Sequence, residues 1–233
     1  MPSPHNTFAA RYLSFISSTE ISVPLPDETE LLYPYENHEV QRVMKLYYHK
    51  YYGDKQKRIF LIGINPGRFG GGVTGIPFTD PEALTSRCFL DHNFTGGREL
   101  SSRFIYDMVD YCGGTDHFFS RYFLTSLSPL GFTWRGKNRN YYDTPALMKA
   151  LKPWLVKSFQ NQLDMGAYRH IAFSLGQGKN FKIITELNRE YHFFDKILPL
   201  PHPRWIMQYR LKDKENYLNI YKDELTKAYE EAE

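Results

Sequence analysis

The segment RIFLIGINPG, residues 58–67, decides the fold. A short apolar run that ends in Asn-Pro-Gly is typical of a buried strand running into a tight turn. Pro66 fixes its own φ and biases Asn65 away from the α region, so the chain must turn sharply there. The sequence therefore predicts a buried strand at residues 58–64, followed at once by a turn that carries a carboxamide.

Similar strands and helices alternate on both sides of this segment. Apolar runs predict further strands, which are residues 121–127, 170–175 and 193–198. Helical spacing and capping residues predict helices, which are residues 8–16, 36–52, 100–111, 145–163, 178–189 and 214–229. This alternation favours an α/β fold, a three-layer α/β/α domain over residues 1–233 with a central, mostly parallel four-stranded sheet. We expect residues 1–50 to form a helical extension packed on that domain.

The loops with unusual chemistry all follow predicted strands. In parallel sheets, ligands bind outside the carboxyl ends of the strands. Those ends meet at one edge, so the sequence predicts a single active site there. The loops concerned are residues 65–78, 126–129, 176–178 and 199–204.

Composition sets broad limits on the class of protein. The net charge of +3 and an aromatic content of 16% only weakly favour a nucleic-acid partner. Two cysteines exclude a disulfide framework and a four-cysteine cluster, and fit a reducing cytoplasm. No apolar run is long enough to cross a bilayer, and residues 1–5 show no secretory leader.

The loop after the first strand can hold a ligand or a water molecule. Its glycines allow the backbone to approach a ligand closely, and Asn65 could orient a water or a carbonyl. An Asn that bonds only its own turn is the alternative. The loop lacks the lysine of a P-loop and the spacing of the dinucleotide fingerprint, so it is not a nucleotide cradle.

Residues 63–78, GINPGRFGGGVTGIPF, closely resemble the first motif of the single-strand-selective monofunctional uracil-DNA glycosylases. The resemblance, within the uracil-DNA glycosylase superfamily, continues over residues 55–210. It implies that Asn65 orients the attacking water and that Phe78 stacks on a flipped base. It also implies that the backbone at Ile64 and Gly67 grips the base. A core ring is the alternative for Phe78.

His202 stands between Pro201 and Pro203, which remove backbone freedom and settle its orientation. A histidine held in this way can donate a hydrogen bond to the departing base. The resemblance supports this role and implies that the following residues act as a wedge that fills the space left by the base. Arg204 and Trp205 suit that task, although packing of Trp205 in the core is equally open.

Ser126 departs from the family pattern, which has an asparagine that reads the base edge at this position. A hydroxyl offers one donor where an amide group offers two donors and an acceptor. Losing one such hydrogen bond costs about 0.5–1.5 kcal/mol. We therefore expect weaker uracil recognition, with a second deaminated base, such as a purine lactam, as a further candidate substrate.

Basic residues near these loops are candidates for contacts with the DNA backbone, with a solvated loop as the alternative for residues 134–140. They are Arg68, Arg135, Lys137, Arg139, Arg204 and Arg210. No Cys or His cluster has the spacing of metal ligands, and neither motif contains a lysine for a lyase step, so we expect no metal and no cofactor.

The sequence predicts a monomeric, monofunctional DNA glycosylase with damaged DNA as its partner. Uracil is the first candidate substrate. A catalytically inactive nucleic-acid-binding homologue and a nucleoside hydrolase on the same scaffold stay open as alternatives.

Overall fold

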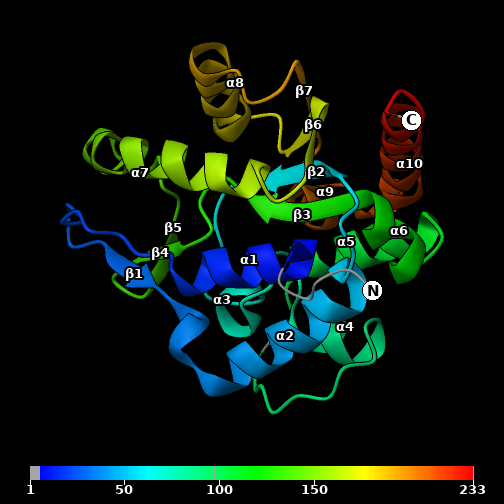
Figure 1. Ribbon diagram of the computed structural model, residues 1–233, viewed down its shortest axis with the longest axis horizontal. Coiled ribbons are helices and arrows are strands. Elements are labelled where there is room, and N and C mark those ends of the chain that lie inside the picture. Colours follow the sequence, from blue (N-terminus) through cyan, green and yellow to red (C-terminus); the bar gives the residue numbers. More distant parts are fainter. Residues whose placement is uncertain (1–5, 97, 233) are drawn as a thin grey trace.

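The computed structural model describes residues 6–96 and 98–232, and its layers confirm the predicted three-layer α/β/α fold (Figure 1). Residues 1–5, on which the expectation about a leader rests, lie outside the described residues. Four strands form a parallel sheet within the described part of the chain. In spatial order they are β3 (Tyr122–Ser126), β2 (Arg58–Gly63), β6 (Ala167–Leu175) and β7 (Lys196–Leu200).

Strand β2 lies inside the sheet because it pairs with β3 on one side and with β6 on the other. Its apolar residues 59–62 are fully buried. Gly63 lies level with Ser126 at the end of β3, and Leu175 at the end of β6 lies level with Leu200 of β7. The predicted convergence of the strand-end loops at one edge of the sheet is thereby confirmed.

Helices cover both faces of the sheet. On one face, Phe60 of β2 and Phe123 of β3 pack against Phe8 of the first helix, α1 (Phe8–Ser17). On the other face, the Tyr122 hydroxyl donates to the Leu225 carbonyl of α10 (Lys214–Glu230) at 2.8 Å. Successive strand residues point to opposite faces, which explains why Tyr122 and Phe123 reach different layers.

The other helices complete these layers. They are α2 (His38–Tyr52), α3 (Gly71–Thr74), α4 (Pro81–Ser86), α5 (Leu100–Tyr111), α6 (Thr115–Arg121), α7 (Pro145–Leu163), α8 (Lys179–Tyr191) and α9 (Pro203–Tyr209). In the described residues, no helix combines the length and the apolar character that a membrane span requires.

The N-terminal helices pack closely on the sheet. Phe8 of α1 stacks on Tyr52 of α2, with ring centroids 5.4 Å apart, and Tyr12 contacts Phe123 of β3. Since these rings are shared with the sheet's own core, we propose that residues 6–50 belong to one domain with the rest of the chain.

A second, small antiparallel sheet is absent from the sequence-based expectations. It is formed by β1 (Glu30–Leu32), β4 (Gly131–Trp134) and β5 (Lys137–Arg139), in that order. The last strand of the main sheet also differs from the prediction: it was expected at residues 193–198, whereas β7 covers Lys196–Leu200 and includes Pro199. An edge strand tolerates proline because one side of it makes no ladder hydrogen bonds.

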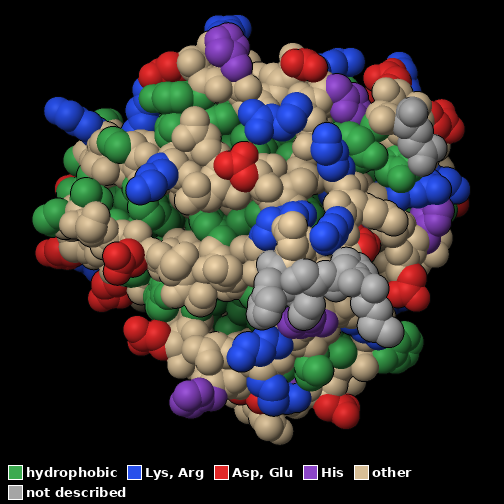
Figure 2. All heavy atoms as spheres, viewed as in Figure 1, with side chains coloured by type: hydrophobic (Ala, Val, Ile, Leu, Met, Phe, Trp, Pro, Cys, Tyr) green, Lys and Arg blue, Asp and Glu red, His purple; other side chains and the backbone are tan. Residues whose placement is uncertain are grey.

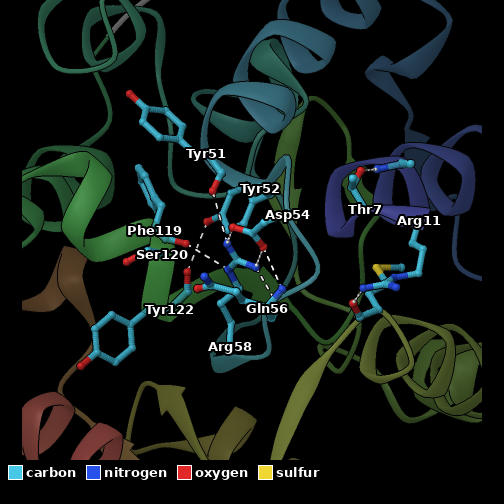
Figure 3. Close-up of polar contacts among 12 residues, drawn as sticks. Thr7, Arg11, Tyr51, Tyr52, Asp54, Gln56, Arg58, Phe119, Ser120 and Tyr122 are labelled. Atoms are coloured by element: carbon cyan, nitrogen blue, oxygen red, sulfur yellow. Dashed lines mark hydrogen bonds and ion pairs between the residues drawn. The ribbon is translucent and has the colours of Figure 1, made fainter. Parts of the chain in front are cut away.

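Arg58 at the start of β2 is fully buried beneath the N-terminal helices (Figure 3). Its guanidinium forms an ion pair with Asp54 at 2.6 Å and donates to the Phe119 carbonyl at 3.1 Å. The rings of Phe8 and Tyr52 lie 5.2 and 5.1 Å from its central carbon. This side chain therefore ties the turn before β2 to α6 and to both N-terminal helices.

We expect Arg58→Ala to lower the free energy of unfolding by about 3–5 kcal/mol, because the change leaves buried carbonyls unpaired and opens a cavity between rings. Urea denaturation followed by circular dichroism measures the loss. Arg189→Ala, at an exposed position of α8, is the matched control and should change stability by less than about 0.5 kcal/mol. Equal effects of the two substitutions would contradict a structural role for Arg58.

Candidate active site

Asn65 lies in the turn after β2, and its carboxamide is held mainly by another segment. The side-chain oxygen accepts from the Tyr141 backbone N–H at 3.2 Å, and the nitrogen donates to the Arg139 carbonyl at 3.2 Å. The nitrogen also donates to the Pro66 carbonyl at 3.1 Å. A carboxamide oxygen has a second lone pair, which is left to accept from a water molecule.

Phe78 lies against the end of β2. A Cβ atom on Gly63 would lie 2.5 Å from the Phe78 ring and 3.1 Å from the Ser126 hydroxyl, so only glycine fits there. Phe78 has φ of 56°, a backbone conformation that L-residues rarely adopt. Residues in such conformations are often found at functional sites. The ring is half-buried, and it lies with the Ser126 hydroxyl beside the same strand end.

Ser126 ends β3 and is 4% exposed. Its backbone carbonyl accepts from the Gln162 side chain of α7 at 3.3 Å, which fixes the end of the strand. The structure therefore brings Ser126, Phe78 and Gly63 together, as the sequence predicts for a site at this edge.

His202 is the N-cap of α9, and Pro203 occupies the first turn of that helix. Its Nδ1 atom accepts from the Arg204 backbone N–H at 3.1 Å. Because a neutral imidazole carries one hydrogen, this bond places the hydrogen on Nε2. His202 can therefore donate only through Nε2.

The electrostatic surroundings keep His202 neutral. Burial, and to a smaller extent the nearby positive charge of Arg204, lower the pKa of His202 to about 4. Both causes disfavour the imidazolium form. At neutral pH the side chain is therefore an uncharged hydrogen-bond donor.

His202 lines a pocket of about 320 Å³ at the carboxyl ends of β2, β6 and β7. Apolar walls come from Ile64 and Leu175, and Trp205 closes one side. Gly176 has φ of 134°, which L side chains rarely adopt, and the position that a Cβ would take there lies 3.5 Å from the ring carbon Cδ2 of His202. This pocket joins the predicted loops after three strands.

Asn180, at the start of α8, is a pocket residue that sequence reasoning missed. It is 3% exposed. Its oxygen accepts from the Tyr141 hydroxyl at 2.7 Å, and its nitrogen lies 3.5 Å from the Gly63 carbonyl. Its position shortly after a Gly-x-Gly turn at a strand end was the available signal.

The proposed wedge residues lie on the first turn of α9. Arg204 is exposed, and Trp205 is 38% exposed, so Trp205 does not belong to the core. The Arg210 guanidinium lies 5.1 Å from the centre of the Trp205 ring. Arg68, in the loop after β2, is exposed and donates to the Gly136 carbonyl.

Strand β5 carries Lys137 and Arg139, two of the basic residues expected to contact DNA, and the structure places their side chains differently. Lys137 is exposed, whereas Arg139 is only 7% exposed. Arg139 forms an ion pair with Asp27 at 3.3 Å and donates to the Thr29 hydroxyl at 2.7 Å. The expectation that Arg139 contacts DNA is therefore wrong in this structure, because its guanidinium is used to hold the loop before β1.

Glu99, just before α5, is a second residue that the sequence did not single out. Its carboxylate packs on Gly70 so closely that a Cβ there would overlap it at 1.8 Å. Burial and the charge of Asp80 raise the pKa of Glu99, Arg204 opposes them, and the resulting pKa is about 7. Glu99 thus lies between the glycine-rich loop and the start of α9.

This raised pKa predicts a pH-dependent stability. The native state holds the Glu99 proton more tightly than the unfolded chain, so its contribution is present below about pH 4.5 and is lost as the pH rises to about 7. We expect Glu99→Gln to gain about 1–2 kcal/mol on wild type between pH 5 and pH 8. Thermal denaturation across this range measures the gain, and parallel curves for the two proteins would contradict it.

The candidate site offers neutral hydrogen-bonding groups at its centre. Among residues 6–96 and 98–232, no group of three or more His, Cys, Asp or Glu side chains is arranged to hold a metal ion. Asn65 can align a water molecule, and His202 can donate to a leaving group that gathers negative charge. Fold and site together define an α/β enzyme whose candidate pocket lies at the carboxyl edge of its sheet.

Comparison with known proteins gives the family. The chain belongs to the uracil DNA glycosylase superfamily, whose sequence pattern matches residues 49–226. The crystal structure of wild-type SMUG2 from Pedobacter heparinus matches with a TM-score of 0.92 and 38% sequence identity, over 95% of this chain and 98% of that one. A search of the curated proteins found no match. The protein is a DNA glycosylase, a hydrolase of N-glycosidic bonds, and the predicted family is confirmed.

Proposed function

We propose that this protein is a monofunctional glycosylase that flips uracil out of DNA and hydrolyses its N-glycosidic bond in base-excision repair. The observation that carries the proposal is the state of His202. Its Nδ1 atom is occupied by the Arg204 N–H and its pKa is lowered to about 4, which leaves a neutral Nε2–H donor in the pocket.

The proposed reaction needs no strong base. As the C–N bond stretches, negative charge gathers on the departing uracil and the sugar gains oxocarbenium character. The Nε2–H of His202 donates to the base oxygen and stabilises this charge. Asn65 orients a water molecule through its side-chain oxygen, and that water adds to the strongly electrophilic sugar carbon. The proton that the water loses neutralises the released uracil anion.

The flipped base would be held between Phe78 and the loop after β2. The Phe78 ring supplies a stacking surface, and backbone groups at Ile64 and Gly67 face the base. Ser126, beside Phe78, offers its hydroxyl to the base edge. The close packing of Gly63, Phe78 and Ser126 supports this assignment.

Contacts with the DNA backbone are proposed for the exposed basic residues around the pocket. They are Arg68, Lys137, Arg204 and Arg210. On the face of the molecule shown in Figure 2, Lys and Arg side chains are interspersed with Asp and Glu. The proposal places the DNA at the strand-end loops because the candidate site lies there, with Arg204 and Trp205 entering the duplex as the wedge.

The test is single-turnover excision from labelled oligonucleotides that carry uracil, hypoxanthine or xanthine, both in single strands and opposite each normal base. Release of uracil that is at least about 100-fold slower in Asn65→Ala and in His202→Ala supports the proposal. DNA binding that weakens with salt, without release of any base, would make the chain a binding homologue. Cleavage of free nucleosides in place of DNA would make it a nucleoside hydrolase.

We expect Ser126→Asn to raise the rate of uracil excision about 2- to 10-fold, since it restores a second hydrogen bond to the base edge. Single-turnover kinetics on uracil in single-stranded DNA measure the change. Ser86→Asn, at an exposed position of α4, is the matched control. An unchanged or lower rate in Ser126→Asn would show that the base does not lie against Ser126.

A further inference from the structure

Asn180 is a buried carboxamide that faces the same pocket as His202 but comes from a different helix. A polar side chain that is 3% exposed must have its hydrogen bonds satisfied or must serve a ligand. The contacts of its two ends therefore decide what it can do.

The orientation of the Asn180 amide follows from its neighbours. A carbonyl oxygen only accepts, so the atom facing the Gly63 carbonyl must be the nitrogen. The Tyr141 hydroxyl donates to the other end, the Asn180 oxygen, at 2.7 Å. The contact with Gly63 is long, at 3.5 Å, and the same carbonyl already accepts from the Leu127 N–H at 3.1 Å. Neither contact uses the second amide hydrogen of Asn180.

Tyr141 connects this amide to the catalytic loop. Its hydroxyl holds Asn180, and its backbone N–H holds the oxygen of Asn65 at 3.2 Å. Tyr141 is fully buried, so both bonds lie in a rigid environment. One residue thus fixes two carboxamides relative to each other, as expected where one aligns the attacking water and the other contacts the base.

We propose that Asn180 reads the flipped base by donating its free amide hydrogen to a carbonyl oxygen of the base, in place of the amide missing at Ser126. This inference rests on the proposed function. An N–H donor at this position would distinguish deaminated bases from normal ones. Uracil and hypoxanthine carry a carbonyl oxygen where cytosine and adenine carry an amino group, and an N–H donor pairs with the oxygen only.

The test compares Asn180→Asp with wild type on uracil and on cytosine in the same oligonucleotide under single turnover. The substitution keeps the shape and replaces the donor with an acceptor. We expect uracil excision to fall about 10- to 100-fold, and the ratio of cytosine to uracil excision to rise at least about tenfold. A residue with a merely structural role would lower both rates alike and leave the ratio unchanged, which would overturn the proposal.

Asn188→Asp is the matched control on the same helix. The Asn188 side chain bonds both the N–H and the carbonyl of Phe194, at 2.8 and 2.9 Å, and is not among the pocket residues. Its substitution should lower the melting temperature without changing the ratio of excision rates. If Asn188→Asp changes that ratio as much as Asn180→Asp does, the assignment to Asn180 is wrong.

A binding assay separates this inference from the proposed function. DNA containing 2′-fluoro-2′-deoxyuridine resists hydrolysis because fluorine destabilises the oxocarbenium character. We expect wild type to bind it at least about tenfold more tightly than the 2′-fluoro-2′-deoxycytidine strand, and Asn180→Asp to lose this preference. If the wild type excises no base but still binds the uridine strand more tightly, only the proposed function is contradicted. If wild type and Asn180→Asp prefer the uridine strand equally, the role of Asn180 is contradicted.

Discussion

His202→Ala is expected to slow single-turnover release of uracil by about 10²–10³-fold, which is the usual effect of removing one preorganised donor to a developing anion. The donor is preorganised here because the Arg204 N–H fixes the tautomer at 3.1 Å and the proline frame fixes the ring. Binding of a 2′-fluoro-2′-deoxyuridine strand should change much less, since the charge develops only as the bond breaks.

The pH dependence distinguishes a neutral donor from an imidazolium. With its pKa lowered to about 4, His202 is uncharged from pH 6 to 8, so its contribution to the rate should be constant there. An imidazolium donor would instead lose activity as the pH rises above 6.5. Stability gives a second check with a defined sign. A lowered folded-state pKa means that stability is lost as the pH falls from 6.5 toward 4, and His202→Ala should lack this loss.

The sequence predicted the main sheet because its strands carry their own local signals. Residues 58–64 form one apolar run that ends in a turn, and such a pattern needs no distant partner to be recognised. The small sheet of β1, β4 and β5 had no such signal. Glu30 pairs with Thr133, about a hundred positions along the chain, and each strand is too short for an alternation of apolar residues to be visible.

The candidate site divides in the same way. Asn65 and His202 stand next to prolines, which mark unusual backbone in the sequence itself. Asn180 lies at the start of a helix whose sequence carries no special signal. Its side chain reaches the pocket only because α8 packs on the sheet. Arg139 lies in a run of basic residues and shares a face of β5 with the exposed Lys137, so alternation along the strand does not tell the two apart. Arg139 is buried because its guanidinium pairs with Asp27 and Thr29, which lie far away in the sequence.

Asn65→Ala is expected to lower single-turnover excision by about 10²–10⁴-fold, because the water loses its orienting acceptor. The variant also loses the bonds that tie the loop after β2 to the Arg139 carbonyl and to the Tyr141 N–H. Asn65→Asp separates these two effects. It keeps an acceptor for the water and for Tyr141, but it places a carboxylate against the Arg139 and Pro66 carbonyls, which accept only.

If orientation of water is the main role, Asn65→Asp should retain more activity than Asn65→Ala, and both should bind a 2′-fluoro-2′-deoxyuridine strand within about threefold of wild type. If the bonds between Asn65 and residues 139–141 matter more, the two variants should be equally slow. Both should then also bind that strand weakly, because Tyr141 of this segment also holds Asn180. Asn161→Ala, at an exposed position of α7, is the control and should match wild type in both assays. Full activity of Asn65→Ala would remove Asn65 from the mechanism, and the attacking water would then need a different acceptor in the pocket.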